Sequence, residues 1–273
     1  MTVLIFSKDR ALQLEGLLSS LLLHCRDVDD IEVIVIFTCS DNDNNRQYQE
    51  VKASYRTVAF LEETDFCAQV KEILRRSSDI IFLVDDTLFV GDFSTGQLKK
   101  LLESYPQAVG VSLRLGQNTV YCYPLNCRQP LPDLITLGDG FFIYEWPVAV
   151  LDFAYPLEIS SSCYRSGDIW KVLGELSFNG PNELEGLLAA NSWRLLPDRP
   201  LLLCPERTLA FSVPVNVVQT KCANRFDGAL GYDLKMLSAL FDQGQRIDVE
   251  RFSGFVPGAC HQPVEYVFKM KED

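Results

Sequence analysis

The chain has 273 residues, of which 47% are hydrophobic and 23% charged, as is typical of a globular protein with a substantial core. Its net charge of −12 argues against a nucleic-acid-binding protein, because such a field repels a phosphate backbone. The net charge does not exclude a nucleotide ligand, since a divalent cation can supply positive charge locally.

The nine cysteines include no C-x-x-C pair, which indicates a reducing compartment rather than disulfides or zinc. The first residues contain too few apolar positions for a signal peptide. The apolar-rich stretch 12–23 is too short and too polar to span a bilayer. We therefore expect a cytoplasmic protein, and leave contact with a membrane surface open.

The first 115 residues alternate strand and helix signals with short spacers. Strands are predicted at 3–6, 31–38, 57–61, 80–84 and 108–113. Helices are predicted at 11–25, 41–55, 65–76 and 94–105. This alternation predicts an α/β fold with a mostly parallel central sheet flanked by helices.

The second half is less regular, and residues 117–133 are predicted to form a loop or irregular hairpin. The stretch 145–162 mixes aromatic residues with prolines and gives no clear element. Strands are expected at 138–144, 200–203 and 208–211, and helices at 166–176, 181–190 and 232–243. No linker separates the two halves, so we predict a single domain over residues 1–273.

Two adjacent carboxylates, Asp85 and Asp86, follow the buried strand 80–84. Burying a carboxylate without a partner is costly, and ligands of open α/β sheets bind at the carboxyl ends of the strands. The pair therefore suggests a metal–diphosphate site. The alternative is that both residues cap a turn or a helix.

The succession from VLIFSKDR through LVDDT to a loop-rich second half resembles the GT-A fold nucleotide-sugar glycosyltransferases, in a family 2-like form. The resemblance implies transfer of a sugar from a nucleotide-diphosphate donor to a carbohydrate acceptor. It makes 1–115 the nucleotide-binding half and 116–273 the acceptor-binding half. By position in the family, four residues would meet the nucleotide: Ser7, Lys8, Asp9 and Arg10. Asp41 would read the base or ribose, with a helix N-cap as the alternative.

The family's metal motif is D-x-D, and the chain departs from it because Thr87 takes the place of the second acid. The resemblance implies that Asp86 contacts Mn²⁺ or Mg²⁺, while Asp85 holds the ribose or a metal-bound water. His261 would be a further metal ligand, since imidazole with carboxylates suits Mn²⁺.

An inverting transfer needs a carboxylate that takes the proton of the acceptor hydroxyl. The family places this base at the start of a helix in the acceptor half, and Glu185 is our first choice. Glu183 and Asp168 are further candidates, although both suit first-turn roles that complement a helix dipole. Three more residues were considered as diphosphate ligands: Arg165, Asn224 and Arg225.

Two other functions compete with this prediction. A sugar nucleotidyltransferase would carry a glycine-rich loop after the first strand, and SKDRALQ contains no glycine. A catalytically inactive relative that binds a glycan or a partner protein would tolerate the incomplete metal motif.

Overall fold

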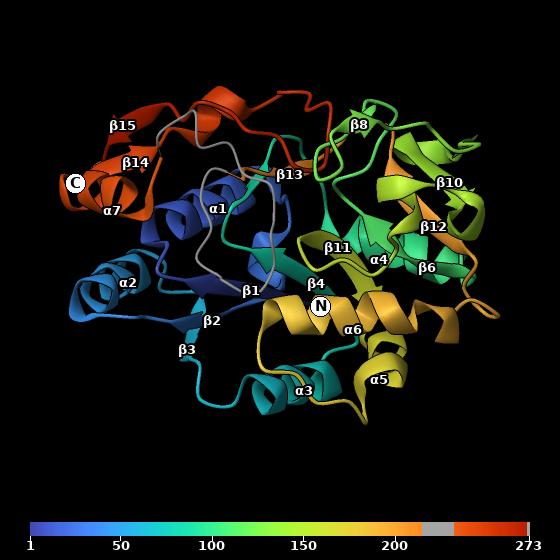
Figure 1. Cartoon of the computed structure of the whole chain (residues 1–273), viewed down its shortest axis with the longest axis horizontal. Helices are drawn as coiled ribbons and strands as arrows, with labels where there is room; N and C mark the ends of the chain where they lie inside the picture. Colours follow the sequence, from blue (N-terminus) through green and yellow to red (C-terminus); the bar gives the residue numbers. More distant parts are fainter. Residues whose placement is uncertain (215–231, 272–273) are drawn as a thin grey trace.

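The structure is a computed structural model that describes residues 1–214 and 232–271. A nine-stranded sheet runs through the molecule (Figure 1). In spatial order its strands are β3 (Ala59–Glu62), β2 (Glu32–Thr38), β1 (Thr2–Lys8), β4 (Asp79–Val84), β11 (Ser161–Arg165), β6 (Ala108–Ser112), β12 (Leu201–Pro205), β10 (Phe141–Glu145) and β9 (Ile135–Thr136). Strands β11 and β10 run antiparallel to their neighbours, and the other strands share one direction.

Helices cover both faces of this sheet. The helices that share a core cluster on one face are α1 (Ala11–His24), α2 (Asn42–Ser54), α4 (Thr95–Ser104) and α7 (Leu234–Asp242). Those on the other face are α3 (Phe66–Arg76), α5 (Ser166–Leu173) and α6 (Pro181–Asn191). Alternate residues of β1 enter opposite clusters, as Ile5 and Leu4 do. This two-sided burial explains why the central strands are continuously apolar.

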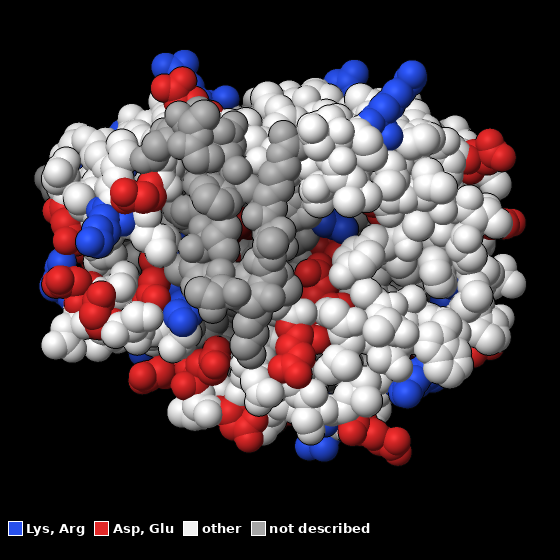
Figure 2. Space-filling view, in the orientation of Figure 1, with Lys and Arg blue, Asp and Glu red and all other residues white. Residues whose placement is uncertain are grey.

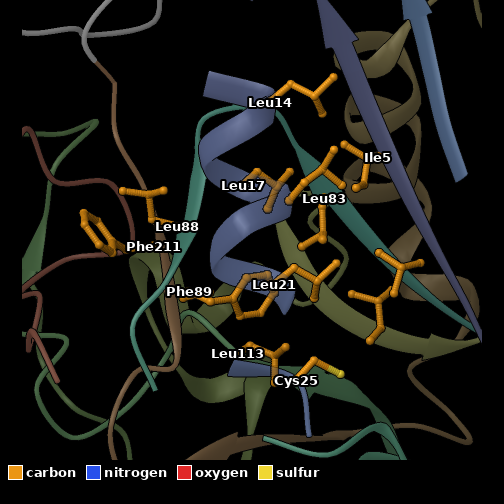
Figure 3. Packing of buried hydrophobic residues seen from close by; sticks show 14 of the residues in the cluster. Ile5, Leu14, Leu17, Leu21, Cys25, Leu83, Leu88, Phe89, Leu113 and Phe211 are labelled. Atoms are coloured by element: carbon orange, nitrogen blue, oxygen red, sulfur yellow. The ribbon is translucent and has the colours of Figure 1, made fainter. Parts of the chain in front are cut away.

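Helix α1 is enclosed on two sides. Its leucines, including Leu17, lie between Leu83 of β4 and a small outer layer that contains Phe211 (Figure 3). The outer layer consists of two short antiparallel pairs: β5 (Thr87–Phe89) with β13 (Ala210–Ser212), and β14 (Gln245–Ile247) with β15 (Phe268–Met270). A further hairpin joins β7 (Tyr121–Cys122) to β8 (Cys127–Arg128). Because β5 follows the acid pair directly, this packing fixes the position of the pair.

The predicted elements of the first half match the structure to within two residues at almost every boundary. The second half departs from the prediction at β11, which begins at the end of the stretch 145–162 and was not predicted as a strand. Its sequence SSCYR is polar in appearance, yet Ser161 and Ser162 are buried between β4 and β6. Local pattern cannot reveal such a strand, because its burial comes from two partners distant in sequence.

Within the described ranges, no helix has the length and apolar character needed to cross a bilayer. Eight of the nine cysteines lie in these ranges, and all eight are free thiols.

Candidate active site

The acid pair lies where β4 ends, beside the end of β1. The parallel pairing of β1 with β4 brings Ser7, Lys8 and Arg10 next to Asp85. The Asp85 carboxylate accepts hydrogen bonds from Ser7 Oγ at 2.9 Å and from the Lys8 amide at 3.2 Å. Its other oxygen accepts from Arg10 Nη1 at 2.9 Å. The structure thus brings together predicted nucleotide-binding residues from the two strand ends.

Asp86 is the more open of the two acids. Its side chain is 17% exposed against 6% for Asp85, and it lies 3.4 Å from Arg10 Nη1. Burial raises the pKa of Asp86 to about 6; Arg10 and a hydrogen bond from Ser212 lower it, and Asp85 raises it. The ionised form of such a carboxylate is stabilised by any additional positive charge placed beside it.

Asp9 and Asp41 organise the turn that follows β2. Asp9 has a left-handed backbone conformation, with φ of 55°. Its carboxylate accepts from the Ser40 amide at 2.7 Å and from Ser40 Oγ at 2.6 Å. Asp41 is the N-cap of α2 and accepts from the Asn44 amide at 2.8 Å. Asp41 therefore has the capping role named above as the alternative, and nucleotide contact by either acid stays a prediction.

A second polar cluster, from the part of the chain after residue 113, adjoins the acid pair. Because β11 is antiparallel to β4, the residues before β11 lie beside the end of β4, where Thr87 Oγ1 donates to the Ser160 carbonyl at 2.9 Å. Glu158 and Arg114 lie here, 1% and 4% exposed, with 3.7 Å between Arg114 Nε and Glu158 Oε1. On the face shown in Figure 2, acidic atoms line a hollow beside α6, with basic atoms at its edge.

Glu185 of α6 belongs to this second cluster. The Ile159 amide donates to Glu185 Oε1 at 3.4 Å. Burial raises the pKa of Glu185, Arg114 lowers it and Glu158 raises it. Glu183 instead points to the start of its own helix, where it accepts from the Asn179 amide at 2.9 Å and is exposed. Of the two glutamates, only Glu185 reaches the cluster beside the acid pair.

Ser212 connects His261 with Asp86, because it contacts both residues. Ser212 forms a β-bridge with His261, and the Val213 amide donates to the Asp86 carbonyl at 2.9 Å. Burial lowers the pKa of His261 to about 4, with Arg114 lowering it further and Glu158 raising it. The neutral imidazole has a buried Nδ1 without a hydrogen-bond partner. Such a nitrogen suits a metal ion, although in the part of the chain described here no three His, Cys, Asp or Glu side chains form a metal-binding group.

Asp168 is not brought to this site. Arg165, the N-cap of α5, pairs with Asp79, so Asp168 lies near the beginning of β4 rather than its end. Its carboxylate contacts Arg199 at 2.9 Å, Lys171 at 3.4 Å and Arg165 at 3.5 Å. These contacts give Asp168 and Arg165 a structural role. The remaining diphosphate candidates, Asn224 and Arg225, lie outside the described residues.

Sequence reasoning missed Arg114 and Glu158. Arg114 follows β6, so the rule that strand ends carry site residues pointed to it. Glu158 gave no such signal, because its position depends on the unpredicted strand β11.

The chain is similar in sequence to a curated protein named bifunctional glycosyltransferase pgtA, from Dictyostelium discoideum. The two are 27% identical over 229 residues, which cover 74% of this chain and 30% of pgtA. No family model matches the chain.

Two solved structures share the fold. TarS of S. aureus superposes with a TM-score of 0.50 and 11% identity, over 77% of this chain and 36% of TarS. GalNAc-T7, solved with UDP, GalNAc and Mn²⁺, gives 0.51 and 11%, over 75% of this chain and 42% of GalNAc-T7. The chain thus spans less than half the length of each relative. It has the GT-A fold, which confirms the predicted fold class, and it resembles a protein named a glycosyltransferase in sequence and GT-A glycosyltransferases in structure.

Proposed function

We propose that this chain is a glycosyltransferase that moves a sugar from a nucleotide-diphosphate donor to a hydroxyl group of a glycan acceptor. The observation that carries the proposal is the meeting of three groups at the end of β4. These are the residues that end β1, the acid pair, and the partly buried carboxylate Glu185. The similarity to pgtA, which is named a glycosyltransferase, supports it. In this reading residues 1–273 form one domain, with 1–115 binding the nucleotide and 116–273 the acceptor.

A divalent cation, Mn²⁺ or Mg²⁺, fits this site. Asp86 and His261 would hold it, because Arg10 offsets the burial of the Asp86 carboxylate only in part and, among the described residues, His261 Nδ1 has no hydrogen-bond partner. When bound, the ion would supply Lewis-acid stabilisation of the diphosphate leaving group. The presence of Mn²⁺ with UDP in GalNAc-T7 supports this assignment.

Glu185 would act as the general base of an inverting transfer. Burial raises the pKa of its carboxyl group. A general base is most effective when its pKa lies near the working pH, so this rise favours proton transfer near neutral pH. Asp85, which accepts three hydrogen bonds from Ser7, Lys8 and Arg10, would be held in place as a positioning group for the ribose.

One observation favours a second candidate, a non-catalytic GT-A protein that binds a glycan or a partner. Arg10 contacts both Asp85 and Asp86, so the acid pair already has a cation from the protein itself. In a binding protein this arrangement would be permanent. In an enzyme Arg10 would turn from Asp86 toward the diphosphate when the donor enters.

A donor-hydrolysis screen over UDP-, GDP- and CMP-sugars, with Mn²⁺, separates these functions. The enzyme is expected to hydrolyse one donor slowly, and Asp86→Ala and Glu185→Ala should each abolish this activity. Glu183→Ala is the matched control on the same helix and should leave it intact. Nucleotide binding by calorimetry without hydrolysis would favour the binding protein, and full activity in both alanine variants would refute the proposed site.

The proposed location of the enzyme rests on its cysteines. Eight free thiols among the described residues suit a cytoplasmic location, where disulfides are rare. Contact with a membrane surface remains a prediction.

A further inference from the structure

A buried arginine beside the proposed base has no evident role in the core. Arg114 is 4% exposed, although arginine is almost never fully buried unless it is paired. Among the described residues, its guanidinium makes one long hydrogen bond, from Nη1 to Ser160 Oγ at 3.4 Å, and its Nε has no hydrogen-bond partner. Burying this charge is costly, so a use beyond stability is expected.

The partner of Arg114 is held much more firmly. The Glu158 carboxylate accepts hydrogen bonds from the Ser160 amide and hydroxyl and from the Ser162 hydroxyl. It also accepts from the Ser161 amide at 3.1 Å. These bonds fix the turn that leads into β11, and Glu158 would keep them without Arg114.

The same turn holds the proposed base. Ile159, which lies inside it, donates its amide to Glu185 Oε1 at 3.4 Å. Arg114 closes the turn from the side of β6, through Glu158 and Ser160. We propose that Arg114 and Glu158 are positioning residues for Glu185, an inference that rests on the proposed function.

Charge supports this geometry. Burial raises the pKa of Glu185, Arg114 lowers it and Glu158 raises it. Among the described residues, Tyr155 also interacts electrostatically with Glu185. Arg114 therefore opposes burial and keeps more of the Glu185 carboxylate ionised near neutral pH.

The test measures the titration of Glu185 by carboxyl ¹³C NMR in the free protein, assigned by difference from Glu185→Gln. Arg114→Met should raise the titration midpoint by about one pH unit. Arg114→Lys should restore most of the shift, and Glu158→Gln should lower the midpoint. The acid limb of the pH–rate profile for transfer should move in the same directions, because the base must be ionised to act.

Arg199→Met is the matched control. It removes an ion pair with Asp168 at the other end of β4, so it should lower the melting temperature and leave the midpoint unchanged. If Arg114→Met does not fold, Arg114→Lys and Glu158→Gln decide the question. Unmoved midpoints in the folded variants would overturn the positioning role, whereas a wild-type protein that consumes no nucleotide sugar would overturn the proposed function instead.

Discussion

Replacing each of the two adjacent acids at the end of β4 by asparagine should change the free energy of unfolding in opposite directions. Burial raises the pKa of Asp86 to about 6 from the usual 3.8, Arg10 and Ser212 partly oppose the rise, and Asp85 adds to it. Above about pH 6 the ionised Asp86 destabilises the fold by about 3 kcal/mol, since each of about two pKa units corresponds to about 1.4 kcal/mol. Asp86→Asn should therefore raise the free energy of unfolding by up to about 3 kcal/mol at pH 7.

The sign of the pH dependence follows from proton binding. Between about pH 4 and pH 6 the folded protein binds a proton at Asp86 more tightly than the unfolded chain does. The stability of the wild type thus falls as the pH rises through this window, whereas asparagine has no proton to lose. The advantage of Asp86→Asn should appear across the window and vanish below about pH 4.

Asp85→Asn is the control for this reasoning. Asp85 accepts from Ser7, from the Lys8 amide and from Arg10, so its replacement breaks a buried ion pair. We expect a loss of about 3 kcal/mol. Urea unfolding between pH 4 and pH 7, with EDTA and without nucleotide, measures both variants. The reasoning would be wrong if Asp86→Asn were no more stable than the wild type at pH 7. It would also be wrong if the stability advantage of the variant were as large at pH 4 as at pH 7.

Four further outcomes are expected. Glu185→Gln should slow transfer by about 100-fold or more while calorimetry shows unchanged donor binding. EDTA should abolish transfer, and His261→Ala should raise the Mn²⁺ concentration needed to restore it by about tenfold, measured by metal titration of the rate. Asp168→Asn should lower the melting temperature without changing the rate at 20 °C, because this residue lies at the far end of β4. Gly110→Ala should destabilise the protein in urea by about 1–3 kcal/mol, since the added Cβ would lie 2.6 Å from the Tyr164 ring.

The fold of residues 1–115 could be predicted because its information is local. Each strand and helix of the first 115 residues has its own apolar period, and parallel strand ends meet at one edge of a sheet. The resemblance to the GT-A family assigned Ser7 and Arg10 to the nucleotide, and the parallel pairing of β1 with β4 explains why both contact Asp85.

The arrangement of residues 116–273 depends on long-range strand pairing that the sequence does not display. Asp168 and Glu185 are both acids near the start of a helix, and a local rule treats them alike. The antiparallel course of β11 separates them, because α5 begins near the start of β4 whereas Glu185 reaches its end. For the same reason Arg114 and Glu158 could not be paired in advance.

The position of β11 also bears on how the chain is made. Strands β4 and β6 are close in sequence, but β11 lies between them and is synthesised about fifty residues after β6. On the ribosome, the facing edges of β4 and β6 therefore stay open until residue 165 has emerged. Open apolar edges invite pairing with other chains. We expect the sheet to close late and the two halves to fold as one cooperative unit, with the acid pair completed only in the final stage.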